Sequence, residues 1–180
     1  MGDTRWLDEE EQRTWRAYLW SFQQIQEALE RQLQRDSGIP HAYYIIMAML
    51  SEAPDRSMTM TELSEVTRFS PSRLSHAVAK LERNGWVERS RHPEDRRTTI
   101  ARLTDAGFAV VEAAAPGHVE EVRRRLFDPL TREQVRQLYE ILIAIQAEDP
   151  PVGLTRQGGR FGENGRQHAG QNVRQNAPRS

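Results

Sequence analysis

The sequence of 180 residues contains no cysteine. A chain without thiols forms no disulfide and no thiolate metal site, has no cysteine nucleophile and cannot sense oxidants through a thiol. These classes of chemistry are excluded before any motif is considered.

Long apolar runs are absent as well. The longest, Ala42 to Leu50, has nine residues, about half of the roughly 18 that span a bilayer. The first residues, Met1 to Trp6, carry neither the basic start nor the apolar stretch of a secretory signal. We therefore expect a cytoplasmic protein.

Motifs that mark enzymes are also missing. Neither G-x-S-x-G nor H-E-x-x-H occurs, and no glycine-rich phosphate loop is present, because six of the eleven glycines lie in residues 151–180. The carboxylates lie on polar faces of predicted helices, where nothing would shift their pKa values. His41, His118 and the glutamates that follow His118 match no strong metal-ligand spacing. We expect a protein that is not an enzyme and that holds no metal and no cofactor.

The net charge of −1 is distributed unevenly. Residues 57–104 hold 9 basic and 6 acidic side chains, and residues 151–180 hold 5 and 1, while residues 1–56 and 105–150 are each net acidic by four charges. Affinity for nucleic acid depends on local neutralisation of phosphates, so a basic segment within an acidic protein is compatible with DNA binding. The alternative is the ordinary charge of solvated helix surfaces.

The middle of the chain has the pattern of two short helices joined by a tight turn. Thr59 to Glu62 is a capping box, which predicts a helix over about residues 60–67. Ser70 and Pro71 suit the cap and first turn of a second helix, which Asn84-Gly85 ends. Its N-terminal half exposes small polar and basic residues. This arrangement is typical of a helix-turn-helix whose recognition helix enters the major groove of DNA.

Two short strands are predicted after the second helix, Trp86 to Arg91 and Thr98 to Leu103. The charged loop between them contains a proline and presents Arg96 and Arg97. A narrow loop that carries arginine fits the minor groove, where phosphates concentrate negative potential. The hairpin therefore predicts the wing of a winged helix-turn-helix, with residues 91–98 in the minor groove.

These segments together resemble the MarR family (multiple-antibiotic-resistance regulators) of winged helix-turn-helix transcription factors. Asp95 to Thr104 fits that family's D-x-R-x5-L-T wing signature, and Ser70 to Val87 reads like its recognition helix, here residues 70–83, and the entry to the wing. The resemblance covers about residues 9–148. It implies a homodimeric, sequence-specific regulator of transcription, a repressor, bound to double-stranded DNA at an inverted-repeat operator.

Helices are predicted on both sides of the winged segment, over about residues 8–35 and 40–53 before it, and from residue 104 to about 127 and from Thr131 onward after it. Pro116-Gly117 predicts a kink or interruption in the third of these. The fold class is therefore mainly α (α+β), a winged helix-turn-helix with long N- and C-terminal helices that form a helical dimerisation domain.

The terminal helices carry more apolar surface than the winged domain can cover. Members of the resembled family dimerise through these helices, which would place two recognition helices about 34 Å apart on successive major grooves. The alternative is a helical core within one chain. The candidate dimer-interface residues are Trp6, Leu7, Trp15, Leu19, Leu126, Phe127, Leu130, Leu138, Leu142 and Ile145.

Four segments follow from these features. Residues 1–56 are N-terminal scaffold and dimerisation helices, 57–104 the winged DNA-binding domain, 105–149 C-terminal dimerisation helices and 150–180 a tail. The tail nearly lacks apolar side chains, so we expect it to be disordered. Its five arginines either contact phosphates or are simply solvated.

Nine residues are candidate DNA contacts. Arg73 has the planar fork that matches the two acceptors of guanine, and short serine side chains allow close approach to phosphates and base edges. In the resembled family the wing arginine enters the minor groove and the aspartate two residues earlier holds it, which maps onto Arg97 and Asp95; an ordinary solvated turn is the alternative. The set comprises Ser70, Ser72, Arg73, Ser75, His76, Lys80, Asp95, Arg96 and Arg97.

Two functional questions stay open at this point. Members of the resembled family often bind small aromatic or anionic effectors between the winged and helical domains; the residues that would border this pocket, unless they are plain core, are Trp15, Tyr18, Trp20, Phe22, His41, Tyr43, Tyr44 and Met47. The competing function is a winged-helix adaptor that binds other proteins and no specific DNA.

Overall fold

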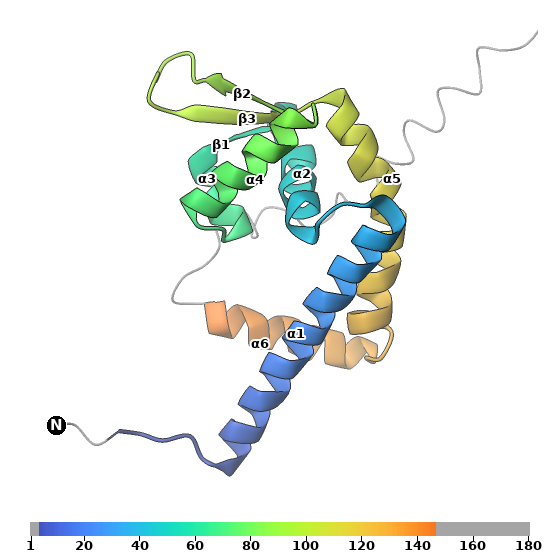
Figure 1. Ribbon diagram of the computed structural model, residues 1–180. Coiled ribbons are helices and arrows are strands. Elements are labelled where there is room, and N and C mark those ends of the chain that lie inside the picture. The colour runs from blue at the N-terminus through green and yellow to red at the C-terminus, as the bar shows by residue number, and fades with distance from the viewer. Residues whose placement is uncertain (1–3, 147–180) are drawn as a thin grey trace, which may run out of the picture.

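The computed structural model describes residues 4–146 (Figure 1). The expected tail, residues 150–180, lies outside them. None of the described helices is long and apolar enough to cross a membrane. The elements in chain order are α1 (Glu9–Ser37), α2 (His41–Glu52), a 3-10 turn η1 (Pro54–Arg56), β1 (Ser57–Thr59), α3 (Met60–Thr67), α4 (Pro71–Arg83), β2 (Val87–Arg91), β3 (Thr99–Leu103), α5 (Asp105–Val122), a π-helical turn η2 (Arg123–Phe127) and α6 (Arg132–Gln146).

Side-chain caps determine where most of these helices begin. Asp8 and Glu11 form a reciprocal capping box at α1, and Thr59 and Glu62 form another at α3. The Thr104 hydroxyl accepts a hydrogen bond from the Gly107 backbone N–H at the start of α5. Each cap satisfies backbone donors that the first turn of a helix leaves without partners.

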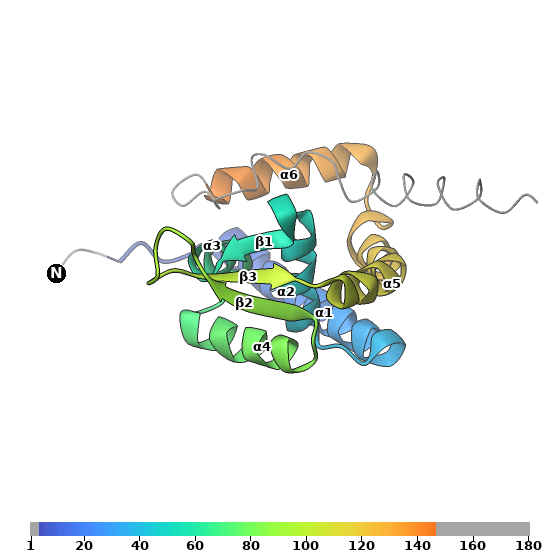
Figure 2. The ribbon, with the colours of Figure 1, turned by 90° about the horizontal axis from the view of Figure 1, so that it is seen from above.

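The small sheet is antiparallel, with strand order β1-β3-β2. The hairpin of β2 and β3 confirms the predicted wing, whereas β1 was not predicted. This strand has only three residues and pairs Ser57 with Arg102 of β3, so it is too short to show an alternating pattern. Seen from above, the loop between β2 and β3 projects from one end of the sheet (Figure 2).

Helix α2 packs with the winged segment. Its residue Leu50 is fully buried in one core with Leu63 of α3, Leu74 of α4 and Leu103 of β3. The boundary expected after residue 56 is therefore not a boundary of the core. We refer to residues 41–103, from α2 to β3, as the winged unit.

Helix α5 continues through Pro116, so of the predicted kink or interruption the interruption is wrong. The helix lies beside α1 (Figure 1), and Gly117 allows the close approach, because a Cβ there would lie 2.9 Å from the Gln32 side-chain nitrogen. Packing against α1 compensates for the hydrogen bond that a proline removes. The irregularity comes later, at η2, where the Asp128 N–H donates to the Arg123 carbonyl over 2.8 Å.

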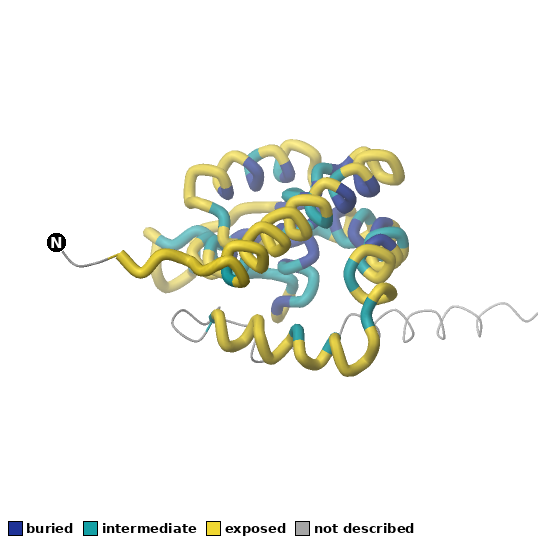
Figure 3. The backbone as a smooth tube through the Cα atoms, turned by 90° about the horizontal axis from the view of Figure 1, so that it is seen from below, coloured by how far each residue is buried: buried dark blue, intermediate teal, exposed yellow. Residues whose placement is uncertain are grey.

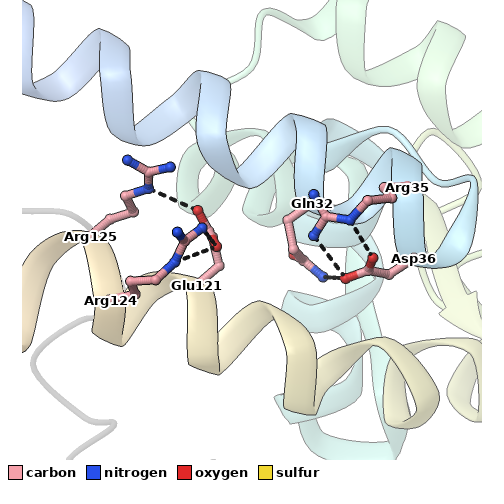
Figure 4. A network of polar contacts seen from close by, with 6 residues as sticks. All are labelled: Gln32, Arg35, Asp36, Glu121, Arg124 and Arg125. Carbon is pink, nitrogen blue, oxygen red and sulfur yellow. Dashed lines mark hydrogen bonds and ion pairs between the residues drawn. The ribbon is translucent and has the colours of Figure 1, made fainter.

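A polar network stabilises the end of α5 (Figure 4). The buried Glu121 carboxylate accepts hydrogen bonds from Arg124 and from Arg125 Nε, the latter over 2.9 Å. The hydrogen bond from Arg124 is the largest cause that lowers the pKa of Glu121. The same two arginines lie in η2, so the network joins α5 to the π-helical turn.

The last helix of the described chain is largely exposed (Figure 3). Helix α6 has no buried residue, although Ile141, Leu142, Ile143 and Ile145 are apolar and exposed. The first half of α1 is exposed in the same way.

Candidate nucleic-acid interface

Helix α4 divides into a buried face and an exposed face. Leu74, Ala77, Val78 and Leu81 are buried in the core. The six residues predicted to contact DNA lie on the other side and are all exposed, namely Ser70, Ser72, Arg73, Ser75, His76 and Lys80. Ser70 accepts a hydrogen bond from the Arg73 backbone N–H over 3.3 Å and so caps the helix. The helix is thus anchored along one face and presents polar and basic groups along the opposite one.

The turn before α4 positions Arg73. Arg68 adopts a left-handed conformation with φ of 55°, and the Ser64 hydroxyl donates to the Phe69 carbonyl over 2.7 Å. The Phe69 ring packs partly against the core, and the Arg73 guanidinium lies over it at 4.1 Å from the ring centroid. The Phe69 ring was not among the residues predicted from the sequence to act at the site.

The wing is organised by Asp95. Its carboxylate accepts hydrogen bonds from the Arg97 backbone N–H over 3.0 Å and from the Thr98 hydroxyl over 2.6 Å. These bonds, with Thr98 first, lower the pKa of Asp95. The resemblance implied that the aspartate holds the arginine; here the contact is made to the backbone of Arg97 rather than to its guanidinium. Arg96 and Arg97 are exposed at the wing.

An ion pair joins the recognition helix to the wing. Glu82 of α4 accepts hydrogen bonds from Arg89 of β2, with Nε at 2.9 Å and Nη2 at 2.5 Å. The hydrogen bond from Arg89 is the largest cause that lowers the pKa of the Glu82 carboxyl. In both ribbon views the N-terminal end of α4 and the β2–β3 loop point toward the same side of the winged unit (Figure 1) (Figure 2).

The residues predicted to border an effector pocket do not come together. Trp15, Tyr18 and Phe22 stack along the exposed side of α1, with ring centroids 5.8 and 6.3 Å apart, and Trp20 is exposed. Tyr44 and Met47 are buried in the core, as the alternative of plain core residues would have them. The partly buried Tyr43 packs against that core.

His41 belongs to a buried polar cluster where α1, α2 and α5 meet. Its ring centroid lies 5.6 Å from that of His118, which lies 4.5 Å from that of Tyr44. The Gln32 Oε1, Tyr44 hydroxyl and His118 Nδ1 atoms are buried without a hydrogen-bond partner among the described residues. Burial lowers the pKa of His118 to about 4 and raises that of Tyr44 to about 12. The residues described form no group of three or more metal-ligating side chains.

A cavity of about 570 Å³ lies at the base of the wing, away from the expected pocket. Its lining is polar and of mixed charge, and none of it was predicted from the sequence. The residues are Asp55, Arg56, Glu88, Arg102, Leu103, Thr104 and Asp105.

Comparison with known proteins points to one family. The family model for the MarR family matches residues 37–98. The crystal structure of Sco3205, a MarR family transcriptional regulator from Streptomyces coelicolor in complex with DNA, is 47% identical with a TM-score of 0.78, over 83% of this chain and 94% of that chain. AbsC, a MarR family transcriptional regulator from the same organism, is 36% identical with a TM-score of 0.76, over 81% and 97%.

A curated relative carries a more specific name. The HTH-type transcriptional repressor YetL of Bacillus subtilis is 29% identical over 85 residues, which are 47% of this chain and 51% of that protein. The alignment thus spans about half the length of YetL. The identity and coverage of the two Streptomyces structures are decisive: this chain belongs to the MarR family of winged helix-turn-helix transcriptional regulators.

Proposed function

We propose that this protein is a homodimeric repressor that binds an inverted-repeat operator in double-stranded DNA, with α4 in the major groove and the β2–β3 wing in the minor groove. The observation that carries the proposal is the exposure of Arg73 at the start of α4 and of Arg97 on the wing, two segments whose free ends point toward the same side of the winged unit (Figure 1). The relative at 47% identity was solved in complex with DNA.

The chemistry of the two segments suits two different tasks. Arg73 offers a planar fork to the two acceptors of guanine, a contact that discriminates against other bases. Arg97 suits the minor groove through its charge, because the narrow groove concentrates negative potential. The short side chains of Ser70 and Ser72 allow the N-terminus of α4 to approach a phosphate oxygen closely. His76 and Lys80 extend the same face toward a base edge and a phosphate, and Arg96 provides a further phosphate contact.

The exposed terminal helices support the homodimer. A helix that buries no side chain gains little from folding against its own chain, and α6 is such a helix. The predicted interface residues on it are Leu138, Leu142 and Ile145, of which the last is 70% exposed. A second copy that covers α6 and the first half of α1 would remove this apolar area from water.

A small aromatic or anionic effector forms part of the same proposal. In the single chain the exposed members of the predicted pocket are Trp15, Tyr18, Trp20 and Phe22. The rings of Trp15, Tyr18 and Phe22 are stacked on one another. Titration of the DNA complex with aromatic acids tests this part, and binding that leaves the operator occupied would contradict it.

Selection of bound sites from random duplex DNA tests the function directly. We expect enrichment of one inverted repeat with half-sites about one helical turn apart, and loss of that enrichment for the Arg73→Ala variant. A folded protein that enriches no sequence would contradict the proposal and favour a protein-binding adaptor.

A further inference from the structure

The guanidinium of Arg73 rests on the ring of Phe69. We infer that Phe69 is a positioning residue for base recognition, one that fixes the Arg73 fork before DNA arrives and so sets sequence specificity. The inference rests on the proposed function, because it concerns how the proposed base contact is made.

One backbone conformation and two contacts fix the position of Phe69 itself. The left-handed Arg68 turns the chain between α3 and α4. The Ser64 hydroxyl binds the Phe69 carbonyl, and the ring is partly buried against the core. Phe69 directly precedes the N-cap Ser70, so its ring reaches the third residue of the helix, which is Arg73. The support under the guanidinium is therefore part of the turn.

The contact with the Phe69 ring does not use the N–H donors with which Arg73 would bind a base. A guanidinium carries its five N–H donors in its plane, at the edge, while its flat face has none. The central carbon of the Arg73 guanidinium lies over the Phe69 ring, 4.1 Å from its centroid, and the ring carries no acceptor oxygen that would take up these donors. A carboxylate partner would instead bind the donors that guanine requires. An aromatic support therefore orients the arginine without competing with the base.

The contact with Phe69 also affects the conformational entropy of the Arg73 side chain. A solvated arginine loses much of its rotamer freedom when it is held against one base. Arg73 is exposed but already rests on a support, so part of this ordering precedes DNA binding. Loss of the ring should then reduce affinity for the operator and should also allow the arginine to accept other bases.

The test uses full-length Phe69→Leu and Phe69→Tyr variants with the selected operator and with an operator in which the guanine read by Arg73 is replaced. We expect Phe69→Leu to lose about two- to fivefold in operator affinity, the range of an exposed cation–π contact, and to discriminate less between the two sites. Phe69→Tyr keeps an aromatic ring and should restore both properties.

A double-mutant cycle separates positioning from a general effect on the fold. In the Arg73→Ala background, Phe69→Leu should change operator affinity no further, because the supported group is gone. An equal loss in both backgrounds would show that Phe69 acts on the fold, and would overturn the inference.

The chain offers a matched control in a second stacked pair. The Arg56 guanidinium lies 3.8 Å from the ring centroid of Phe108, at the start of α5. Phe108→Leu removes an equivalent stack from outside the helix-turn-helix and should leave discrimination between the two operators unchanged. Equal losses of discrimination in Phe69→Leu and Phe108→Leu would contradict a specific role for Phe69.

A spectroscopic readout is independent of DNA. In the free protein the side-chain N–H resonance of Arg73 should carry a ring-current shift that Phe69→Leu abolishes and Phe69→Tyr retains; an unshifted resonance would overturn the inference. Wild-type protein without sequence preference would overturn the proposed function and with it the inference. If the wild-type protein is sequence-selective but the effects of Phe69→Leu and Arg73→Ala on operator affinity are additive, the inference fails and the proposed function stands.

Discussion

At the scale of single residues, His118 combines burial with the ability to titrate. It lies against the rings of His41 and Tyr44, and burial lowers its pKa to about 4. The pKa of His41 is lowered as well, by burial, against the opposing effect of Glu30. Both rings are therefore neutral in the folded protein at pH values where the unfolded chain takes up protons, because an unperturbed histidine has a pKa of about 6.5.

We predict that His118 makes the protein sensitive to mild acid. A lowered histidine pKa contributes stability that is fully present above pH 6.5 and decreases as the pH falls from 6.5 toward about 4. Urea unfolding of wild type and His118→Gln at several pH values across this range measures the effect. The variant should lose less stability on acidification; parallel pH profiles would contradict the prediction.

Arg97 provides a second prediction at this scale. Its side chain is exposed on the wing, so Arg97→Ala should leave the melting temperature nearly unchanged. Loss of a charged contact with DNA should cost about 1.5–3 kcal/mol, roughly ten- to a hundredfold in operator affinity. Electrophoretic mobility shift at fixed salt measures it.

Arg31→Ala is the matched control for Arg97→Ala. Arg31 is an exposed arginine on α1, paired with Glu27, and its removal changes the net charge by the same amount. Similar losses of affinity in the two variants would show only an effect of total charge. An equal loss on every DNA sequence would show that Arg97 positions the protein and does not read the site.

At the scale of elements, the junction between the wing and α5 depends on a glycine. A Cβ on Gly107 would lie 2.1 Å from the Trp86 carbonyl oxygen. That oxygen also accepts the Thr104 N–H over 3.0 Å, and the Thr104 hydroxyl binds the Gly85 carbonyl. The backbone around the contact is thus held in place from two sides.

We predict that Gly107→Ala destabilises the protein although it improves helix propensity. Alanine gains about 0.5–1 kcal/mol in a helix, whereas overpacking against fixed backbone costs about 1–3 kcal/mol, so a net loss of about 1–2 kcal/mol is expected. Urea unfolding measures it. Gly117→Ala is the control, since its Cβ would meet the flexible end of Gln32; a larger loss there than at Gly107 would contradict the prediction.

The elements that could be predicted are those with local signals. The capping box at Thr59 and the Ser70-Pro71 start place α3 and α4 correctly. Strand β1 was not predicted because its extended conformation depends on pairing with β3, which lies more than forty residues away in the sequence. Helix α5 passes Pro116 because packing against α1 outweighs a local preference.

The sequence indicates which residues of the candidate site are exposed, but it does not indicate the contacts among them. The exposure of Arg73 and Arg97 follows from helix periodicity and from the wing signature. The stack on Phe69 and the ion pair between Glu82 and Arg89 depend on how the turn and the hairpin fold back. The buried position of Tyr44 likewise depends on a tertiary neighbour, because helical spacing alone does not distinguish a core face from the wall of a pocket.

At the scale of the whole molecule, the unburied helix α6 leads to a prediction about assembly. Leu142→Glu with Ile145→Glu should convert a dimer into a monomer, because charges in an apolar interface are costly to desolvate. Light scattering after gel filtration measures the mass, and operator binding should fall with it, since two half-sites are no longer bound together. Gln137→Glu on the same helix is the control. A wild-type monomer at micromolar concentration would contradict the homodimer.

The ion pair between Glu82 and Arg89 has a consequence for how a regulator with this fold could be switched off. Helix α4 and the strands of the wing share one core, and Glu82 of α4 pairs with Arg89 of β2, so moving them apart within one subunit would expose buried side chains. In a dimer, the adjustable quantity is instead the separation and tilt between the two subunits. A signal that releases the operator would therefore change the distance between the two winged units of a dimer and leave the shape of each winged unit intact.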